Sequence, residues 1–237
     1  MLAENYARIR DRLAAAARRA GREPESVRLV AVSKGRPLSA IRELYELGQR
    51  DFGENRVEEA GDKITAARNE GLDITWHMIG HIQSRKARMV TTEFNWAHSV
   101  ESVSLPERLS RSANESNRIL PILLECNVSG EEAKYGLAAD RMGTDPAQWD
   151  ALCAVVEAIL AQPHVQVRGL MTMASVVTEP EQARPVFKKL RDLHDRLVVR
   201  FPATAWRELS MGMTDDFEPA IEEGATMVRI GRAIFEV

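Results

Sequence analysis

Lys34 is the residue of this sequence best placed for covalent chemistry. It follows a short, mostly apolar run, residues 27–32, and leads into Gly35-Arg36-Pro37, a pattern that indicates a strand passing into a loop and a helix. A lysine amine that loses its proton can attack a carbonyl, whereas an arginine stays protonated and forms no imine. Only six of the 32 basic residues are lysines. We therefore treat Lys34 as a candidate reactive amine, with a solvated surface lysine as the alternative.

A later segment, residues 209–216, has the small residues and donors of an anion site. It is a turn that enters an expected helix, where backbone N–H groups and the helix dipole favour negative charge. The hydroxyl of Ser210 is a further donor. Capping alone is the alternative, because Asp215 and Glu218 have the spacing of a capping box, and we expect them to cap the helix in either case.

Arg229 and Gly231 lie at the end of the last apolar run. They share one strand face, so an inward Arg229 would lie beside the pocket in which Gly231 lets the backbone approach a ligand. A buried arginine is more often an ion-pair partner than a ligand. Together with the amine of Lys34 and the anion site, however, these residues suit a phosphate-bearing aldehyde.

The elements that must position these groups follow a strict alternation of strand-like and helix-like segments. Strands are expected at residues 28–33, 51–53, 75–79, 94–98, 120–127, 165–170, 206–209 and 227–230. Amphipathic helices are expected at residues 38–47, 56–69, 104–114, 146–161 and 182–200. The alternation predicts a parallel sheet, and eight repeats predict an α/β fold of the TIM type: a (β/α)8 barrel in one domain, residues 1–237. In such a barrel the first and last strands are neighbours.

An additional helix is expected before the first strand. In the first twenty residues Tyr6, Ile9, Leu13 and several alanines share one helical face, and Gly21 gives a stop signal. Residues 231–237 leave no room for an eighth outer helix after the last strand. We expect the N-terminal helix to fill that position.

Composition favours a small-molecule binding protein. The net charge is −3 with acids and bases interspersed, which does not match a nucleic-acid binder. Cys126 and Cys153 have no metal-ligand spacing and are too few for a disulfide framework, which fits a reducing compartment. No segment has the apolar length of a membrane span, and Glu4 and Asp11 argue against a signal or transit peptide. We expect a cytoplasmic protein with no membrane partner.

Other polar residues at strand ends are weaker candidates. His77 and His81 resemble a metal motif, but on a strand they would lie too far apart for one ion. His77 could face the pocket or simply pack in the core. Asn55 could cap the next helix with Glu58 or reach into the barrel mouth.

Six segments in matching order resemble the pyridoxal phosphate homeostasis protein family. They are residues 31–34 (Ala-Val-Ser-Lys), 52–55 (Phe-Gly-Glu-Asn), 76–80 (Trp-His-Met-Ile-Gly), 169–171 (Gly-Leu-Met), 209–213 (Leu-Ser-Met-Gly-Met) and 228–231 (Val-Arg-Ile-Gly). The resemblance runs from about residue 4 to residue 236. It implies a barrel similar to the N-terminal domain of alanine racemase, with pyridoxal 5′-phosphate (PLP) as its cofactor.

The resemblance implies specific roles. Lys34 would form an imine with PLP, residues 210–213 and the backbone of residues 231–232 would hold the phosphate, and Arg229 would face the pyridine nitrogen. The expected cofactor-binding residues are Lys34, Asn55, His77, Met173, Ser210, Gly212, Met213, Arg229, Gly231 and Arg232. Arg232 replaces a frequent Thr or Ser and so removes a hydroxyl. Met173 stands where the racemase pattern has a histidine, and it can pack on the ring but cannot carry a proton.

These residues favour binding over catalysis. An arginine only donates hydrogen bonds and cannot accept one from a protonated ring nitrogen, so it keeps that nitrogen unprotonated and weakens PLP as an electron sink. We expect a PLP homeostasis protein that holds the cofactor as a reversible imine without robust turnover. Its partners would be PLP and apo PLP-dependent enzymes, and its state a monomer or weak dimer. The alternatives are a PLP-dependent racemase that uses His77 or Tyr135 as base, and an aldolase-type barrel.

Overall fold

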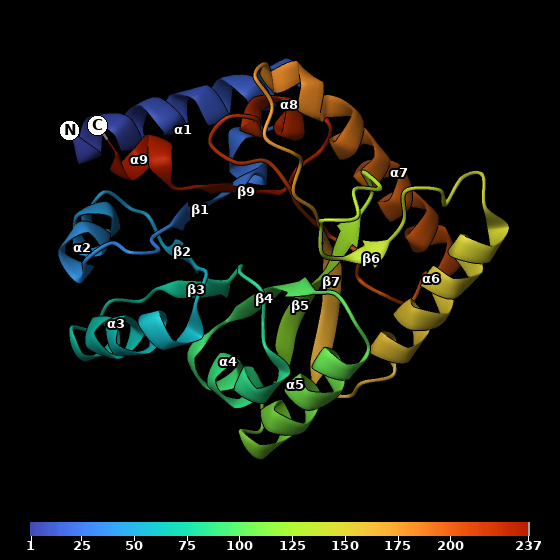
Figure 1. Cartoon of the computed structure of the whole chain (residues 1–237). Coiled ribbons are helices and arrows are strands. Elements are labelled where there is room, and N and C mark those ends of the chain that lie inside the picture. Colours follow the sequence, from blue (N-terminus) through green and yellow to red (C-terminus); the bar gives the residue numbers. More distant parts are fainter. Residues whose placement is uncertain (237) are drawn as a thin grey trace.

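Eight parallel strands close into a barrel in this computed structural model, which describes residues 1–236. The strands pair in the order β4-β3-β2-β1-β9-β8-β7-β5, and a pairing between β4 and β5 closes the ring (Figure 1). Their bounds are β1 Arg28–Val32, β2 Asp51–Glu54, β3 Thr75–Met78, β4 Trp96–Val100, β5 Leu120–Asn127, β7 Val165–Met171, β8 Glu208–Ser210 and β9 Met227–Ile230. The predicted barrel is confirmed. One short strand was missed: β6, Leu137–Ala138, pairs with β5 outside the ring.

Helices surround the barrel on its outer face (Figure 1). They are α1 Leu2–Arg19, α2 Leu38–Glu46, α3 Val57–Asn69, α4 Ala87–Glu93, α5 Ser104–Glu115, α6 Pro146–Leu160, α7 Arg184–Arg200, α8 Phe217–Glu222 and α9 Arg232–Phe235, with 3-10 turns at Pro24–Ser26, Ser84–Lys86 and Pro180–Ala183. The helix α4 was not predicted from the sequence. Near its end, two consecutive threonines have hydroxyls that donate to the Arg88 carbonyl, and such residues have low helix propensity.

The N-terminal helix α1 packs against α8, α9 and α2, where an eighth outer helix would lie (Figure 1). Its predicted apolar face is buried at Tyr6, Ile9 and Leu13. After the last strand, residues 232–235 form the single turn α9.

The expected capping box at the start of α8 is wrong. The N-cap of α8 is Asp216, and no side chain caps the helix. Asp215 instead forms an ion pair with Arg232. Glu218 forms an ion pair with Arg12 of α1, 2.8 Å away. Glu218 therefore joins segments far apart in sequence, whereas Asp215 joins the loops after the neighbouring strands β8 and β9.

The core has two layers, separated by the strands. Alternate strand residues point outward and pack under the helices, and Phe52, Trp76 and Leu124 belong to this large outer cluster. The opposite faces point into the barrel, where Leu123, Met171 and Met227 form a small apolar cluster packed against Trp96. Buried polar residues, among them His77, His98 and Ser210, share this interior. Within residues 1–236, no helix combines the length and apolarity that a membrane span requires.

Candidate functional site

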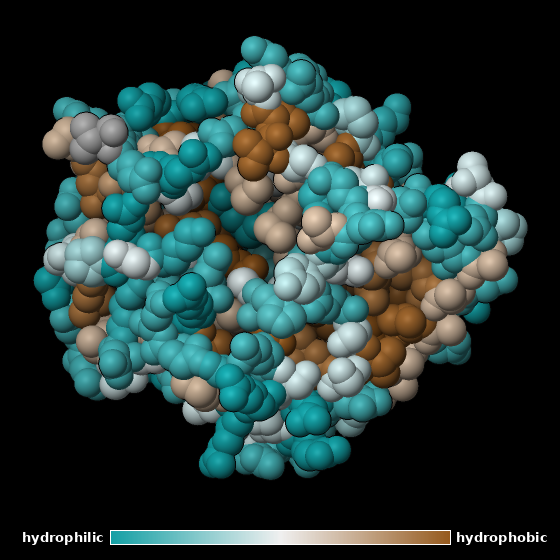
Figure 2. Space-filling model, in the orientation of Figure 1, coloured by the Kyte–Doolittle hydropathy of each residue, from teal (hydrophilic) through white to brown (hydrophobic). Residues whose placement is uncertain are grey.

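A cavity of about 410 Å³ opens where the strands of the barrel end. Figure 2 shows it as a hollow in the middle of this face, with hydrophilic and apolar side chains around it. Its lining residues are Val32, Lys34, Asn55, Ile79, Met173, Ala174, Ser175, Val176, Val177, Met213, Thr214, Asp215, Asp216, Arg229, Gly231, Arg232 and Glu236. The loops after β1, β7, β8 and β9 supply most of them, as expected for a barrel site.

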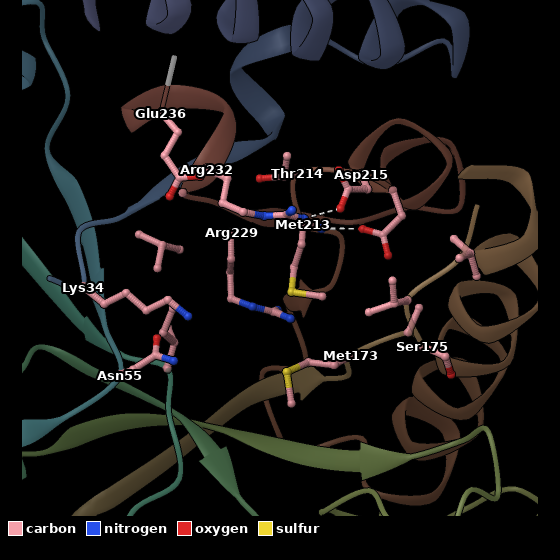
Figure 3. Close-up of a pocket in the computed structure, with 17 residues that line it drawn as sticks. Lys34, Asn55, Met173, Ser175, Met213, Thr214, Asp215, Arg229, Arg232 and Glu236 are labelled. Atoms are coloured by element: carbon pink, nitrogen blue, oxygen red, sulfur yellow. Dashed lines mark hydrogen bonds and ion pairs between the residues drawn. The ribbon is translucent and has the colours of Figure 1, made fainter. Parts of the chain in front are cut away.

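The amine of Lys34 reaches into this cavity beside the amide of Asn55 (Figure 3). The preceding residue, Ser33, anchors the loop at three points. Its N–H donates to the carbonyl of Gly53 at 2.9 Å, and its hydroxyl donates to Glu54 Oε1 at 2.7 Å. Lys63 Nζ donates to the carbonyl of Ser33 at 2.9 Å. The backbone before Lys34 is therefore rigid, while its side chain is free to extend into the cavity.

The guanidinium of Arg229 lies on the cavity wall and is only 4% exposed. Nη1 donates to the hydroxyl of Ser210 at 2.6 Å, and Nη2 donates to the carbonyl of Thr172 at 2.9 Å. Burial lowers the pKa of Arg229 to about 10, although the charges of Asp216 and Glu125 oppose this shift. Arg229 is therefore a cation at neutral pH. No carboxylate among residues 1–236 lies within ion-pair distance of it.

The turn after β8 brings its backbone close to α8. Gly212 has a φ of +92°, and a side chain there would place Cβ 2.6 Å from Ala220 Cβ and 2.9 Å from Phe217 Cα. Only glycine fits this position without displacement of α8. The next N–H, on Met213, donates to Asp216 Oδ1 at 2.6 Å. The turn is thus fixed both by sterics and by a side-chain acceptor.

After the neighbouring strand β9, Gly231 lies against β1. A Cβ at Gly231 would lie 3.1 Å from the carbonyl oxygen of Val32. Arg232 follows at the start of α9, with its side chain 66% exposed and paired with Asp215 across the mouth (Figure 3). The guanidinium thus stays at the rim, next to the backbone that we expect to hold an anion.

Seven of the ten expected cofactor-binding residues line the cavity: Lys34, Asn55, Met173, Met213, Arg229, Gly231 and Arg232. Gly212 shapes the turn from outside the lining. Ser210 is fully buried, and its hydroxyl lies beneath Arg229 rather than on the cavity wall. His77 is also fully buried and contacts Asp51 and His98 in the barrel interior. Of the two roles considered for Asn55, the structure places it at the barrel mouth, and α3 has no side-chain cap.

A second polar group lies at the ends of β4 and β5. Glu125 is 4% exposed, and burial, together with the nearby charge of Glu101, raises the pKa of Glu125 to about 7. Glu101 Oε1 lies 3.0 Å from His81 Nδ1, and the His81 ring stacks on Tyr135. Tyr135 is 62% exposed and does not line the cavity. Neither base considered for a racemase, His77 or Tyr135, therefore reaches the cavity wall.

Sequence reasoning missed several residues of the site. The segment 174–177 forms one wall of the cavity, but its sequence, Ala-Ser-Val-Val, has no motif that marks a ligand site. His98 was only part of an expected strand. Asp216 lies within the expected anion turn, and its side chain, of a type that often accepts from backbone N–H groups, was the feature that could have identified it. No group of three His, Cys, Asp or Glu side chains that could hold a metal ion occurs in the described part of the chain.

Comparisons with known proteins agree on one family. A family model described as alanine racemase, N-terminal domain, matches residues 5–237. A pyridoxal phosphate homeostasis protein of Pseudomonas aeruginosa is 41% identical over 234 residues, which cover 99% of this chain and 94% of the relative. The protein of that name from Escherichia coli K12 is 39% identical, with 99% and 95% covered. The structure of PipY from Synechococcus elongatus PCC7942, solved with PLP bound, is similar with a TM-score of 0.82 at 37% identity, and covers 99% of this chain and 100% of PipY.

Proposed function

The chain belongs to the pyridoxal phosphate homeostasis protein family, and from this we propose that it binds PLP in the cavity lined by Lys34 and Arg229. The observation that carries the proposal is that one cavity contains a lysine amine, a buried guanidinium and a glycine-shaped turn. PLP offers a matching set of groups: an aldehyde, a ring nitrogen and a phosphate. We propose that Lys34 holds the aldehyde carbon as a reversible imine.

The remaining groups have complementary positions. The guanidinium of Arg229 has only N–H donors, so it favours an acceptor such as an unprotonated ring nitrogen. The backbone at Met213 and Gly231 borders the cavity from the loops after β8 and β9, where barrels commonly hold a phosphate. Arg232 at the rim adds a positive charge. Met173 offers an apolar contact to the ring.

Carriage of the cofactor, without robust turnover, agrees best with these side chains. An arginine at the ring nitrogen leaves that nitrogen unprotonated, which weakens PLP as an electron sink. The two bases considered for a racemase, His77 and Tyr135, do not line the cavity. We infer that PLP is stored and released by exchange with free amines. Apo PLP-dependent enzymes are the proposed recipients.

The test is covalent trapping of PLP with borohydride. The wild-type protein, incubated with PLP and reduced, is expected to gain the mass of one reduced PLP on the peptide that contains Lys34. The Lys34→Ala protein is expected to gain none, and Lys188→Ala, which alters an exposed lysine of α7, should behave as wild type. Equal trapping in the Lys34→Ala protein, at any other lysine, would refute the assignment.

Release and turnover are distinguished by adding amino acids to the loaded protein. Exchange predicts that the absorption of the protein-bound imine decreases as the amine takes the cofactor. A racemase predicts in addition that solvent deuterium enters the α-carbon. Sustained deuterium incorporation over many turnovers would replace the carrier proposal with the enzyme.

A further inference from the structure

A continuous chain of buried polar side chains runs through the barrel interior beneath the cavity. Arg229 Nη1 lies 2.6 Å from Ser210 Oγ, and Ser210 Oγ lies 3.0 Å from His98 Nδ1. His98 Nε2 lies 3.0 Å from His77 Nδ1, and His77 Nε2 lies 2.9 Å from Asp51 Oδ1. Five different strands supply these residues: β9, β8, β4, β3 and β2. We call this set the relay.

The donors and acceptors of the relay can point in only one direction. Burial lowers the pKa of His77 and lowers the pKa of His98 further, so both imidazoles are neutral near pH 7. A neutral imidazole has one N–H and one bare nitrogen. Because the Asp51 carboxylate only accepts, His77 Nε2 carries the proton, and His77 Nδ1 must accept.

The same reasoning continues to the cavity. His98 Nε2 must donate to His77, so His98 Nδ1 is bare and accepts the Ser210 hydroxyl proton. The oxygen of Ser210 is left to accept from Arg229. Every hydrogen bond therefore runs from the guanidinium towards Asp51, which is 21% exposed at the start of β2, the end of that strand away from the cavity.

This direction fixes Arg229. Ser210 cannot turn its own proton towards the guanidinium, because that proton is committed to His98. Two acceptors, Ser210 Oγ and the carbonyl of Thr172, then define the plane of the guanidinium. The remaining N–H groups are available to an acceptor in the cavity.

We propose that Asp51, His77, His98 and Ser210 are positioning residues that hold the guanidinium of Arg229 in the one orientation that presents its free donors to bound PLP. The inference rests on the proposed function, because it assigns the relay to the same site. Apolar side chains normally fill the interior of such a barrel, and buried polar groups cost stability unless all of them are paired. Apolar side chains could fill the same space, but they could not orient Arg229, and this orientation is the role we assign to the polar interior.

The first experiment needs no PLP, so it separates failure of the relay from failure of the proposed function. Two-bond 1H–15N spectra of the ligand-free protein report which ring nitrogen of each histidine carries the proton. His77→Gln and His98→Gln spectra assign the two signals among the five histidines. We expect a proton on Nε2 and a bare Nδ1 in both. A proton on Nδ1 of either ring would overturn the relay.

The second experiment compares two replacements of His98. Glutamine retains one acceptor and one donor, whereas leucine has neither. In His98→Leu the Ser210 hydroxyl loses the acceptor that orients it beneath Arg229, so we expect the Kd for PLP to rise about tenfold or more, whereas His98→Gln should retain most of the affinity. Thermal unfolding of the same proteins separates this effect from general loss of stability.

Ser210→Ala is a smaller change that breaks the same relay if the leucine variant does not fold. Its matched control is Ser110→Ala in α5, which also removes a buried hydroxyl, here the acceptor of the His164 N–H. We expect only the Ser210 variant to lose PLP affinity. Equal affinity in wild type, Ser210→Ala and His98→Leu would overturn the proposal, as would losses that match those of Ser110→Ala.

Discussion

Replacement of Lys63 tests how the reactive loop is held. Lys63 Nζ lies 2.7 Å from Glu54 Oε1 and 2.9 Å from the carbonyl of Ser33, the residue before Lys34. The Glu54 side chain is 1% exposed and that of Lys63 is 12% exposed. Lys63→Met would leave a buried carboxylate whose one remaining hydrogen bond is from the Ser33 hydroxyl.

The expected loss of stability in Lys63→Met follows from the burial of the Glu54 carboxylate. Removal of one partner from a buried ion pair costs about 3–5 kcal/mol, and the partial exposure of Lys63 favours the lower end. For a protein of this size, about 3 kcal/mol corresponds to a decrease in Tm of roughly 6–12 °C. Lys188→Met, on the exposed face of α7, should leave Tm unchanged.

A double variant separates the charge from the anchor. Glu54→Gln combined with Lys63→Met removes the uncompensated charge, so most of the lost stability should return. The bond from Lys63 to the Ser33 carbonyl is still missing, so the Kd for PLP should remain raised. Calorimetry and a PLP titration measure the two effects. An unchanged Tm in Lys63→Met would refute the burial argument, and full recovery of PLP affinity in the double variant would refute the role of the anchor.

Two further changes test the interior carboxyl and the turn after β8. The folded-state pKa of Glu125, about 7, exceeds its ordinary value of 4.5, so the folded protein binds this proton more tightly than the unfolded chain does. The protein therefore loses up to about 3 kcal/mol of stability as pH rises between these two values, and Glu125→Gln should remove that loss. Identical urea-unfolding curves for wild type and Glu125→Gln, both at pH 5 and at pH 8, would contradict this expectation. Gly212→Ala should lower the free energy of unfolding by about 2 kcal/mol or more, because the new Cβ would overlap α8. The control is Gly71→Ala, at a φ of +73° in open space, which should cost only about 1 kcal/mol of backbone strain. Equal decreases in Tm for the two variants would show that the contact with α8 is unimportant.

The barrel could be predicted because each of its eight strands is marked by local sequence. The apolar run before Lys34 and the glycine after β9 are examples of features that indicated strand ends. The alternation of strands with amphipathic helices predicted the topology. The strand β6 has only two residues, too few for a periodic signal. The helix α4 has only seven residues, and Val90, Thr91 and Thr92 among them have low helix propensity, so its periodic signal is weak.

The relay could not be predicted for a different reason. His77 and His98 are 21 residues apart, and His98 and Ser210 are 112 residues apart. Their contacts depend on strand register and on which side chains point inward across the barrel, and neither is encoded in a local motif. For His77, pocket contact and core packing were both considered, but its role as a link between a carboxylate and a second imidazole was not.

The polar interior also explains why two basic residues of the site differ in environment. Lys34 lies on an exposed loop, where its amine can meet an aldehyde, and only its backbone is anchored. Arg229 lies deep on β9 and depends on interior acceptors for its orientation. A covalent bond tolerates a flexible side chain, because bond formation itself sets the geometry. A hydrogen bond to a ring atom does not tolerate a flexible donor, since the strength of the bond depends on alignment. The fold therefore places the relay beneath the arginine, whereas the buried Ser33 and Glu54 hold only the backbone before the lysine.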